Sequence, residues 1–182
     1  MTDGPGPGEP VVQLGPPVSE VAWSPDFVAQ TLEVLIVYLD DEEAAWLKPV
    51  HAEALRVGLP VSAKPGEVVL ETLGWYGLAP RVVHSTSWRH EDGRVVLTYM
   101  AVIEPPPSLE PDTLSPVPVE RTGLARGETT APPSDIGVTA VLEHALRHLA
   151  WLVKDDPAIA AALPDWVPLL DPYEPEPFRA LG

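Results

Sequence analysis

The sequence predicts a single α+β domain, in which a mixed or antiparallel β-sheet packs against helices. Three observations predict it: an apolar run over residues 31–40, two alternating runs around a turn within residues 81–104, and an amphipathic pattern over residues 138–154. The first two are typical of strands, and the third has the period of a helix. The 182 residues, 45% of them hydrophobic, are enough for one sizeable core.

Proline divides the chain into regions. It occupies 24 of the 182 positions, well above the usual share of about 5%. The prolines gather near the N-terminus, within residues 104–133 and after residue 163. We therefore expect a proline- and glycine-rich arm over 1–24, a domain over 25–163 that contains a proline-rich loop at 104–135, and an extended tail over 164–182. The tail has three aromatic side chains that can pin it to the surface, Trp166, Tyr173 and Phe178.

The composition argues against several partners. The net charge of −16 repels phosphate backbones, so no nucleic acid is expected. The longest apolar run, over residues 34–39, is far too short to cross a membrane, and no secretory leader is visible. We expect a cytoplasmic protein with no membrane partner, and the excess of arginine over lysine favours a bacterial origin. Because cysteine is absent, disulfides, thiolate metal sites and a cysteine nucleophile are excluded.

The first elements are a strand and a helix. Residues 31–40 are apolar at nearly every position and rich in β-branched side chains, as in a buried strand. Residues 42–59 predict a helix that begins at Asp40 or Asp41, is kinked by Pro49, and ends at an arginine and a glycine.

Residues 81–104 predict a β-hairpin, because Asp92-Gly93 between two alternating runs is a strong turn signal. An uninterrupted pairing around a two-residue loop gives the strands two faces. The face toward the core carries His84, Thr86 and Trp88. The other face carries Ser85, Ser87 and Arg89.

Residues 138–154 predict the longest helix, with its apolar positions in one arc. These positions are Val138, Val141, Leu142, Ala145, Leu146, Leu149, Leu152 and Val153. His144, His148 and Trp151 lie on one flank of the arc. Glu143 and Arg147 form an i,i+4 pair that we expect on the solvent side.

The histidines suggest a metal site. His144 and His148 have the spacing that lets two helical imidazoles bind one metal ion, and a third ligand would come from His84, His90 or a distant acid. The alternative is that both histidines pack beside the apolar arc, each with one ring nitrogen hydrogen-bonded. No cofactor is expected, because the sequence has neither a P-loop nor a dinucleotide-binding glycine pattern.

The first strand of the hairpin suggests a binding surface. His84 next to Ser85 and Ser87 looks like part of a catalytic triad, but neighbours along a strand point to opposite faces. We therefore predict no nucleophilic site. Ser85, Ser87 and Arg89 form a row of donors that can bind a carboxylate or phosphate; the alternative is an ordinary solvated strand face.

The middle of the chain resembles a known family. Pro65-Gly66-Glu67 opens a helix predicted over residues 66–78, Gly77-Leu78 closes it, and the hairpin follows. This order resembles a Nudix domain over residues 31–103, with the helix over 138–153 as the family's late helix. The resemblance implies a glutamate cluster that holds magnesium against a diphosphate. Only Glu67 and Glu71 remain here, so it also implies that hydrolysis has been lost. The chain further resembles uncharacterised conserved proteins of actinobacteria, which implies no activity.

We therefore expect a non-catalytic binding or regulatory protein that uses the 81–104 hairpin face and the flank of the 138–154 helix. The expected ligand-binding residues are Arg89, Ser87, Ser85, His84, Trp88, His144 and His148. One alternative is a metal-dependent hydrolase of a phosphorylated, nucleotide-like molecule, with the metal held by His144, His148, Glu67 and Glu71. Another is a protein-interaction module that uses the proline-rich loop and tail. The expected partner is a small anionic ligand or a protein, and the oligomeric state stays open.

Overall fold

The computed structural model describes residues 30–41, 43–110, 112–121 and 136–175. The strands are β1 (Gln30–Asp40), β2 (Glu43–Pro49), β3 (Leu55–Gly58), β4 (Pro80–Glu91), β5 (Arg94–Ile103) and β6 (Leu114–Pro118), and the helices are α1 (Pro65–Trp75), α2 (Val138–Asp155), α3 (Pro157–Ala162) and α4 (Val167–Leu170). The arm predicted over 1–24 lies outside the described residues, as do Phe178 and residues 122–135 of the predicted loop.

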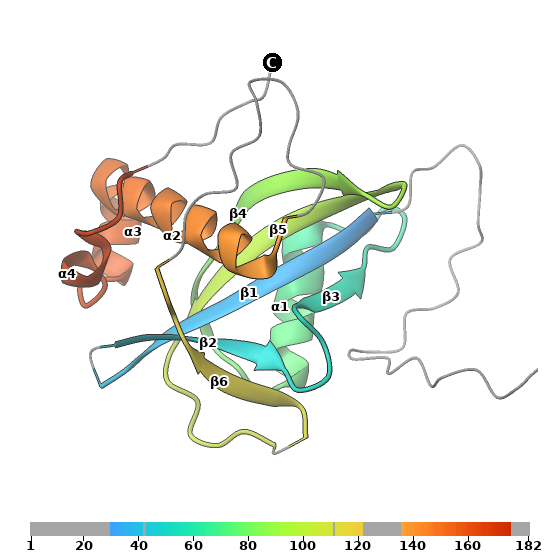
Figure 1. The fold of residues 1–182 in the computed structure, drawn as a ribbon, viewed down its shortest axis with the longest axis horizontal. Coiled ribbons are helices and arrows are strands. Elements are labelled where there is room, and N and C mark those ends of the chain that lie inside the picture. Colours follow the sequence, from blue (N-terminus) through green and yellow to red (C-terminus); the bar gives the residue numbers. More distant parts are fainter. Residues whose placement is uncertain (1–29, 42, 111, 122–135, 176–182) are drawn as a thin grey trace, which may run out of the picture.

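The strands form one six-stranded mixed sheet with β1 at its centre. The order is β4-β5-β1-β2-β6, and β3 also pairs with β1. β1 runs parallel to β5 and antiparallel to β2 and β3, which pair with successive halves of it. Helix α1 covers one face of the sheet, and α2 with α3 and α4 covers the other (Figure 1). The prediction of a single α+β domain with a mixed sheet is confirmed.

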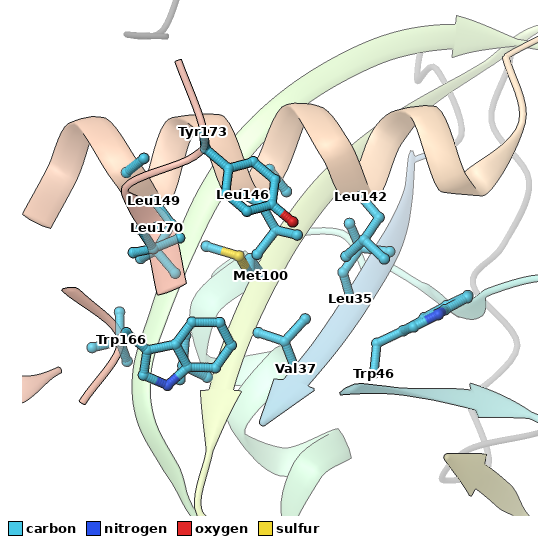
Figure 2. Packing of buried hydrophobic residues seen from close by; sticks show 14 of the residues in the cluster. Leu35, Val37, Trp46, Met100, Leu142, Leu146, Leu149, Trp166, Leu170 and Tyr173 are labelled. Atoms are coloured by element: carbon cyan, nitrogen blue, oxygen red, sulfur yellow. The ribbon is translucent and has the colours of Figure 1, made fainter. Parts of the chain in front are cut away.

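Side chains that alternate along β1 serve two cores. Leu35 and Val37 pack under α2, whereas Val34 and Ile36 pack under α1. Figure 2 shows the α2 side, where Met100 of β5 lies beneath Leu146 of α2. A strand buried on both faces needs apolar residues at nearly every position, which explains the run that predicted it.

The helix predicted over residues 42–59 is wrong. Residues 43–49 form β2 instead, and residues 55–58 form β3. Asp41 has φ 46 and lies in the turn between β1 and β2, a conformation that aspartate tolerates. Alanine, glutamate and leucine favour a helix locally, but both antiparallel pairings with β1 outweigh that preference.

The hairpin prediction is confirmed, but its register contains a β-bulge. Ser87 lies opposite Thr98, as predicted, whereas Ser85 lies opposite Tyr99, so Thr86 is an extra residue in β4. The bulge moves residues 82–85 to the other face relative to the rest of the strand, and a second register shift follows between Pro80 and Val82. His84, opposite Met100, consequently shares a face with Ser87 and not with Trp88.

Helices α1 and α2 form where they were predicted, but Glu143 and Arg147 do not lie on the solvent side, since their side chains are 1% and 14% exposed. α1 ends before Gly77, which has φ 65. The apolar arc of α2 packs on the sheet, and Asp156 caps α3 by accepting the Ala158 N–H at 2.8 Å. Glu143 is buried, not on the solvent side, because Arg121 and the C-terminal segment cover it. None of the helices in the described residues is long and apolar enough to cross a bilayer.

The proline-rich loop and the tail contain structure that the sequence did not predict. Residues 114–118 form the edge strand β6, in which Pro116 and Pro118 lie two apart and so turn their missing N–H groups to the open edge. The tail is not extended throughout, because residues 167–170 form α4. Trp166 and Tyr173 are buried in the core beneath α2.

Candidate functional site

Near the hairpin turn, the face of the sheet that α2 covers becomes polar. The apolar cluster on this face includes Leu35 and Met100. One step closer to the turn, the same face carries Glu33 of β1 opposite Thr98 of β5. The Glu33 side chain is only 1% exposed, so its charge requires partners within the protein.

Arg89 of β4 is the first partner of Glu33. Its Nη2 donates to Glu33 Oε1 at 2.8 Å and its Nη1 to Oε2 at 2.9 Å, the paired geometry that guanidinium and carboxylate prefer. Nη1 also donates to Thr98 Oγ1 at 3.2 Å, and Nε donates to Glu91 Oε2 at 3.0 Å. The Arg89 side chain is 10% exposed, so it is a buried structural cation.

Arg56 of β3 is the second partner. Its Nε and Nη2 donate to Glu33 Oε1 at 3.2 and 2.9 Å, Nη2 donates to Glu91 Oε2 at 3.1 Å, and Nη1 donates to Glu91 Oε1. These bonds use four of the five N–H groups of a guanidinium and leave one on Nη1. The Arg56 side chain is 40% exposed, so that N–H can meet solvent or a ligand.

The two arginines determine the charge of Glu33. Burial opposes ionisation of this carboxyl, but hydrogen bonds and charge attraction from Arg89, and then from Arg56, outweigh it and lower its pKa. Hydrogen bonds from Arg56 are the largest influence on Glu91 and lower its pKa as well. We call Glu33, Arg56, Arg89, Glu91 and Thr98 the tip network. It is a preorganised set of two positive and two negative charges.

A pocket of about 490 Å³ lies beside the tip network. Its lining comes from the start of β1, from β3, and from both sides of the hairpin turn: Thr31, Arg56, Val57, Gly58, Glu91, Asp92, Arg94 and Val96. Arg94 is exposed and has no ion pair within the described residues. The pocket therefore combines a free guanidinium with one that the tip network holds in place.

The structure separates the residues that the sequence grouped on the hairpin. Ser85 and Trp88 pair with Tyr99 and Leu97, which places them on the α1 side, whereas Ser87 and Arg89 are on the α2 side. The prediction that Ser85 shares a face with Ser87 and Arg89 is therefore wrong, because of the bulge. Trp88, predicted to face the core, is 51% exposed.

His84 meets the flank of α2 in a stack of rings. Its ring centroid lies 5.2 Å from that of His148, which lies 5.5 Å from that of Trp151. Burial lowers the pKa of His84, and the charge of Asp156 partly opposes that effect. His144 is half-buried on the same helix. The stack packs β4 against α2, and neither His144 nor His148 lines the pocket.

The metal ligands proposed from the sequence do not come together. Glu67 and Glu71 are exposed on α1, on the opposite side of the sheet from His144 and His148 of α2. Glu67 is bonded instead to Lys64 at 2.8 Å. Within the described ranges, no three histidine, aspartate or glutamate side chains are grouped as a metal site.

Sequence reasoning missed Thr31, Glu33, Arg56 and Arg94. A signal did exist for Glu33, because a glutamate inside the apolar run of β1 has to be paired. No local signal identified Arg56 as its partner, since residues 42–59 resembled a helix.

The chain matches no protein-family model and no curated protein. Among solved structures it is similar to one from Chromobacterium violaceum, described as a candidate member of the nudix hydrolase family. The two chains are 13% identical, the match covers 81% of this chain and 93% of the other, and the TM-score is 0.44. The match names the same family as the sequence resemblance, but similarity at this level carries no conclusion about chemistry.

Proposed function

We propose that the protein is a non-catalytic binding protein that holds a small polar anion in the pocket at the hairpin turn. The observation that supports it is the pair of cations in the lining: Arg94, free of ion pairs in the described part of the chain, and Arg56, with one N–H left on Nη1. A carboxylate or phosphate accepts hydrogen bonds from two guanidinium groups at once.

The tip network supports binding by fixing Arg56 before a ligand arrives. Glu33 and Glu91 each accept hydrogen bonds from Arg56, so its side chain loses little freedom when an anion binds. Arg94 has no such restraint among the described residues, and it is expected to close onto the ligand. The anion therefore meets one rigid donor and one adaptable donor.

The carboxylates of the pocket narrow the class of ligand. Glu91 and Asp92 line it together with the two arginines, so the lining has no net charge. They accept hydrogen bonds but give none when ionised. A ligand that satisfies both kinds of group carries an anionic group and also a hydroxyl or ammonium donor, as a hydroxy acid, an amino acid or a sugar phosphate does.

The chemistry of the lining favours binding over catalysis. Glu91 has a lowered pKa and accepts hydrogen bonds from Arg56 and Arg89. A general acid or base works best when its pKa is near the operating pH. Thr31, the hydroxyl of the lining, has no histidine among its pocket neighbours to activate it.

This proposal keeps the hairpin as the place of binding, as expected from the sequence, but assigns the binding to other residues. Arg89 acts behind the pocket by holding Glu33 and Glu91. The flank of α2 contributes packing through His148, which contacts the ring of His84 in β4.

A thermal-shift screen tests the proposal with phosphate, malate, serine and glucose 6-phosphate as probes. A ligand at 100 times its Kd stabilises the native state by about 2.7 kcal/mol, or roughly 5 to 10 °C for a domain of this size. We expect such a shift for at least one probe in the wild type, and its loss in Arg94→Gln. Lys154→Gln is the matched control, since Lys154 is also exposed and without an ion pair in the described residues. No shift with any probe, or equal shifts in both variants, rejects the proposal.

A further inference from the structure

The outer face of α1 exposes two large apolar side chains. Leu70 is 50% exposed and Trp75 is 62% exposed. The inner face of the helix is buried through Val69, Thr72 and Leu73. At 100° per residue, Leu70 and Trp75 flank the outer face about 140° apart. Aromatic side chains such as that of Trp75 are enriched at protein contact surfaces relative to the rest of a protein surface.

Between these two side chains, the helix surface includes a position without a side chain. Gly74 lies near the middle of the outer face, and a Cβ placed on it would meet nothing within 4 Å. Gly74 is the penultimate residue of α1, so its missing side chain leaves the backbone accessible at the C-terminal end of this face. The backbone of a partner can therefore approach α1 closely between Leu70 and Trp75.

The charge of this face decides what kind of partner fits. Glu67 and Glu71 lie on either side of the centre line of the outer face. Glu67 is bonded to Lys64, but Glu71 has no ion pair within the described ranges. A second copy of the chain would bring the same carboxylates face to face. The segments outside the described ranges contain at most one basic residue each, so the chain itself has no strongly cationic segment to place there.

We infer that the outer face of α1 docks a cationic amphipathic helix of a partner protein. Apolar side chains of that helix contact Leu70 and Trp75, and its lysines or arginines pair with Glu71. Gly74 lets the two helices approach closely. This surface lies on the opposite side of the sheet from the tip network, so it does not depend on the anion pocket.

Labelled synthetic peptides test the inference by fluorescence anisotropy. The probe is an 18-residue lysine–leucine peptide with helical amphipathic spacing. One control peptide has glutamate in place of every lysine, and another has the same lysines and leucines in scrambled order. We expect saturable binding of the probe and of neither control, because the scrambled peptide has the charge without the apolar face.

Protein variants locate the binding. Trp75→Ala, Leu70→Ser and Glu71→Lys are each expected to weaken binding of the probe by about tenfold or more. The matched controls are Trp88→Ala, an exposed tryptophan on β4, and Asp155→Lys, an exposed acid at the end of α2; neither is expected to change binding more than about twofold. The inference is overturned if the probe does not bind, if the scrambled peptide binds equally well, or if the control variants lose as much affinity as the α1 variants. Thermal melting of each variant confirms that it is folded.

Discussion

Two buried glutamates of this protein are each held by two arginines, yet the two clusters serve different ends. Glu33 lies in the central strand and is held by Arg56 and Arg89. Glu143 lies in α2 and is held by Arg121 and Arg147. All three residues of the first cluster are fixed in the sheet. In the second, Arg121 follows the edge strand β6, and only the other two lie in a helix.

The surroundings of the arginines separate the clusters further. Arg121 stacks on the ring of Tyr173, with its guanidinium carbon 4.0 Å from the ring centroid, and donates to Pro172 O at 2.9 Å. The Glu143 cluster therefore attaches the C-terminal segment to α2. Within the described ranges, the Glu33 cluster joins three strands of the sheet and holds Arg56 at the edge of a pocket. Similar pairs of charges can thus close a fold in one place and, as we propose, prepare a binding surface in another.

The comparison predicts its largest effect at Glu33. Glu33→Ala leaves Arg89, only 10% exposed, without its main counter-charge. Breaking a buried pair in this way costs about 3 to 5 kcal/mol of unfolding free energy. Urea denaturation at neutral pH measures it, and a loss below about 1 kcal/mol would mean that the tip network is not structurally required.

A smaller effect is expected at Glu143. Glu143→Ala removes an acceptor from Arg147 and Arg121, but the Arg121 side chain is 46% exposed and can turn to water. We expect a loss of about 1 to 3 kcal/mol, together with faster proteolysis after residue 170. If Glu143→Ala is more destabilising than Glu33→Ala in the same urea experiment, the contrast between the clusters is wrong.

The smallest effect is a dependence on pH. The pKa of Glu33 and that of Glu91 are below the ordinary value of 4.5, so the unfolded chain takes up protons before the folded one as pH falls. The stability from these carboxylates is fully present well above pH 4.5 and is lost as pH falls below that value toward the folded pKa. Glu91→Gln should make the acid loss less steep, as followed by urea titrations between neutral and acid pH. An unchanged slope would show that Glu91 titrates alike in both states.

Much of the fold could be predicted because it depends on local pattern. β1 is apolar on both faces, Asp92-Gly93 marks the hairpin turn, and the arc of α2 has the helical period. The prediction for residues 42–59 failed because their composition favours a helix, while two long-range pairings with β1 decide their structure. No local pattern in residues 42–59 reveals that they will pair with β1.

The candidate site could not be predicted, because it depends on contacts between residues that lie far apart in the sequence. Glu33 is 23 residues from Arg56 and 56 from Arg89 along the chain. The bulge at Thr86 also changed which hairpin residues share a face. Arg89 was predicted to bind the carboxylate or phosphate of a ligand, and the carboxylates that it meets in the structure are Glu33 and Glu91 of the protein itself. The residue that we propose for an external anion is Arg94, beyond the turn.

The most direct test of the proposed anion pocket is an NMR titration that follows the arginine Nε–Hε signals. The probe is the compound that gives the largest thermal shift. We predict that the Arg94 signal moves most and the Arg56 signal next, while those of Arg121 and Arg147 stay in place, because they belong to the cluster that closes the fold. Movement at Arg121 or Arg147 with Arg94 unchanged would contradict the assignment of the hairpin turn as the binding site.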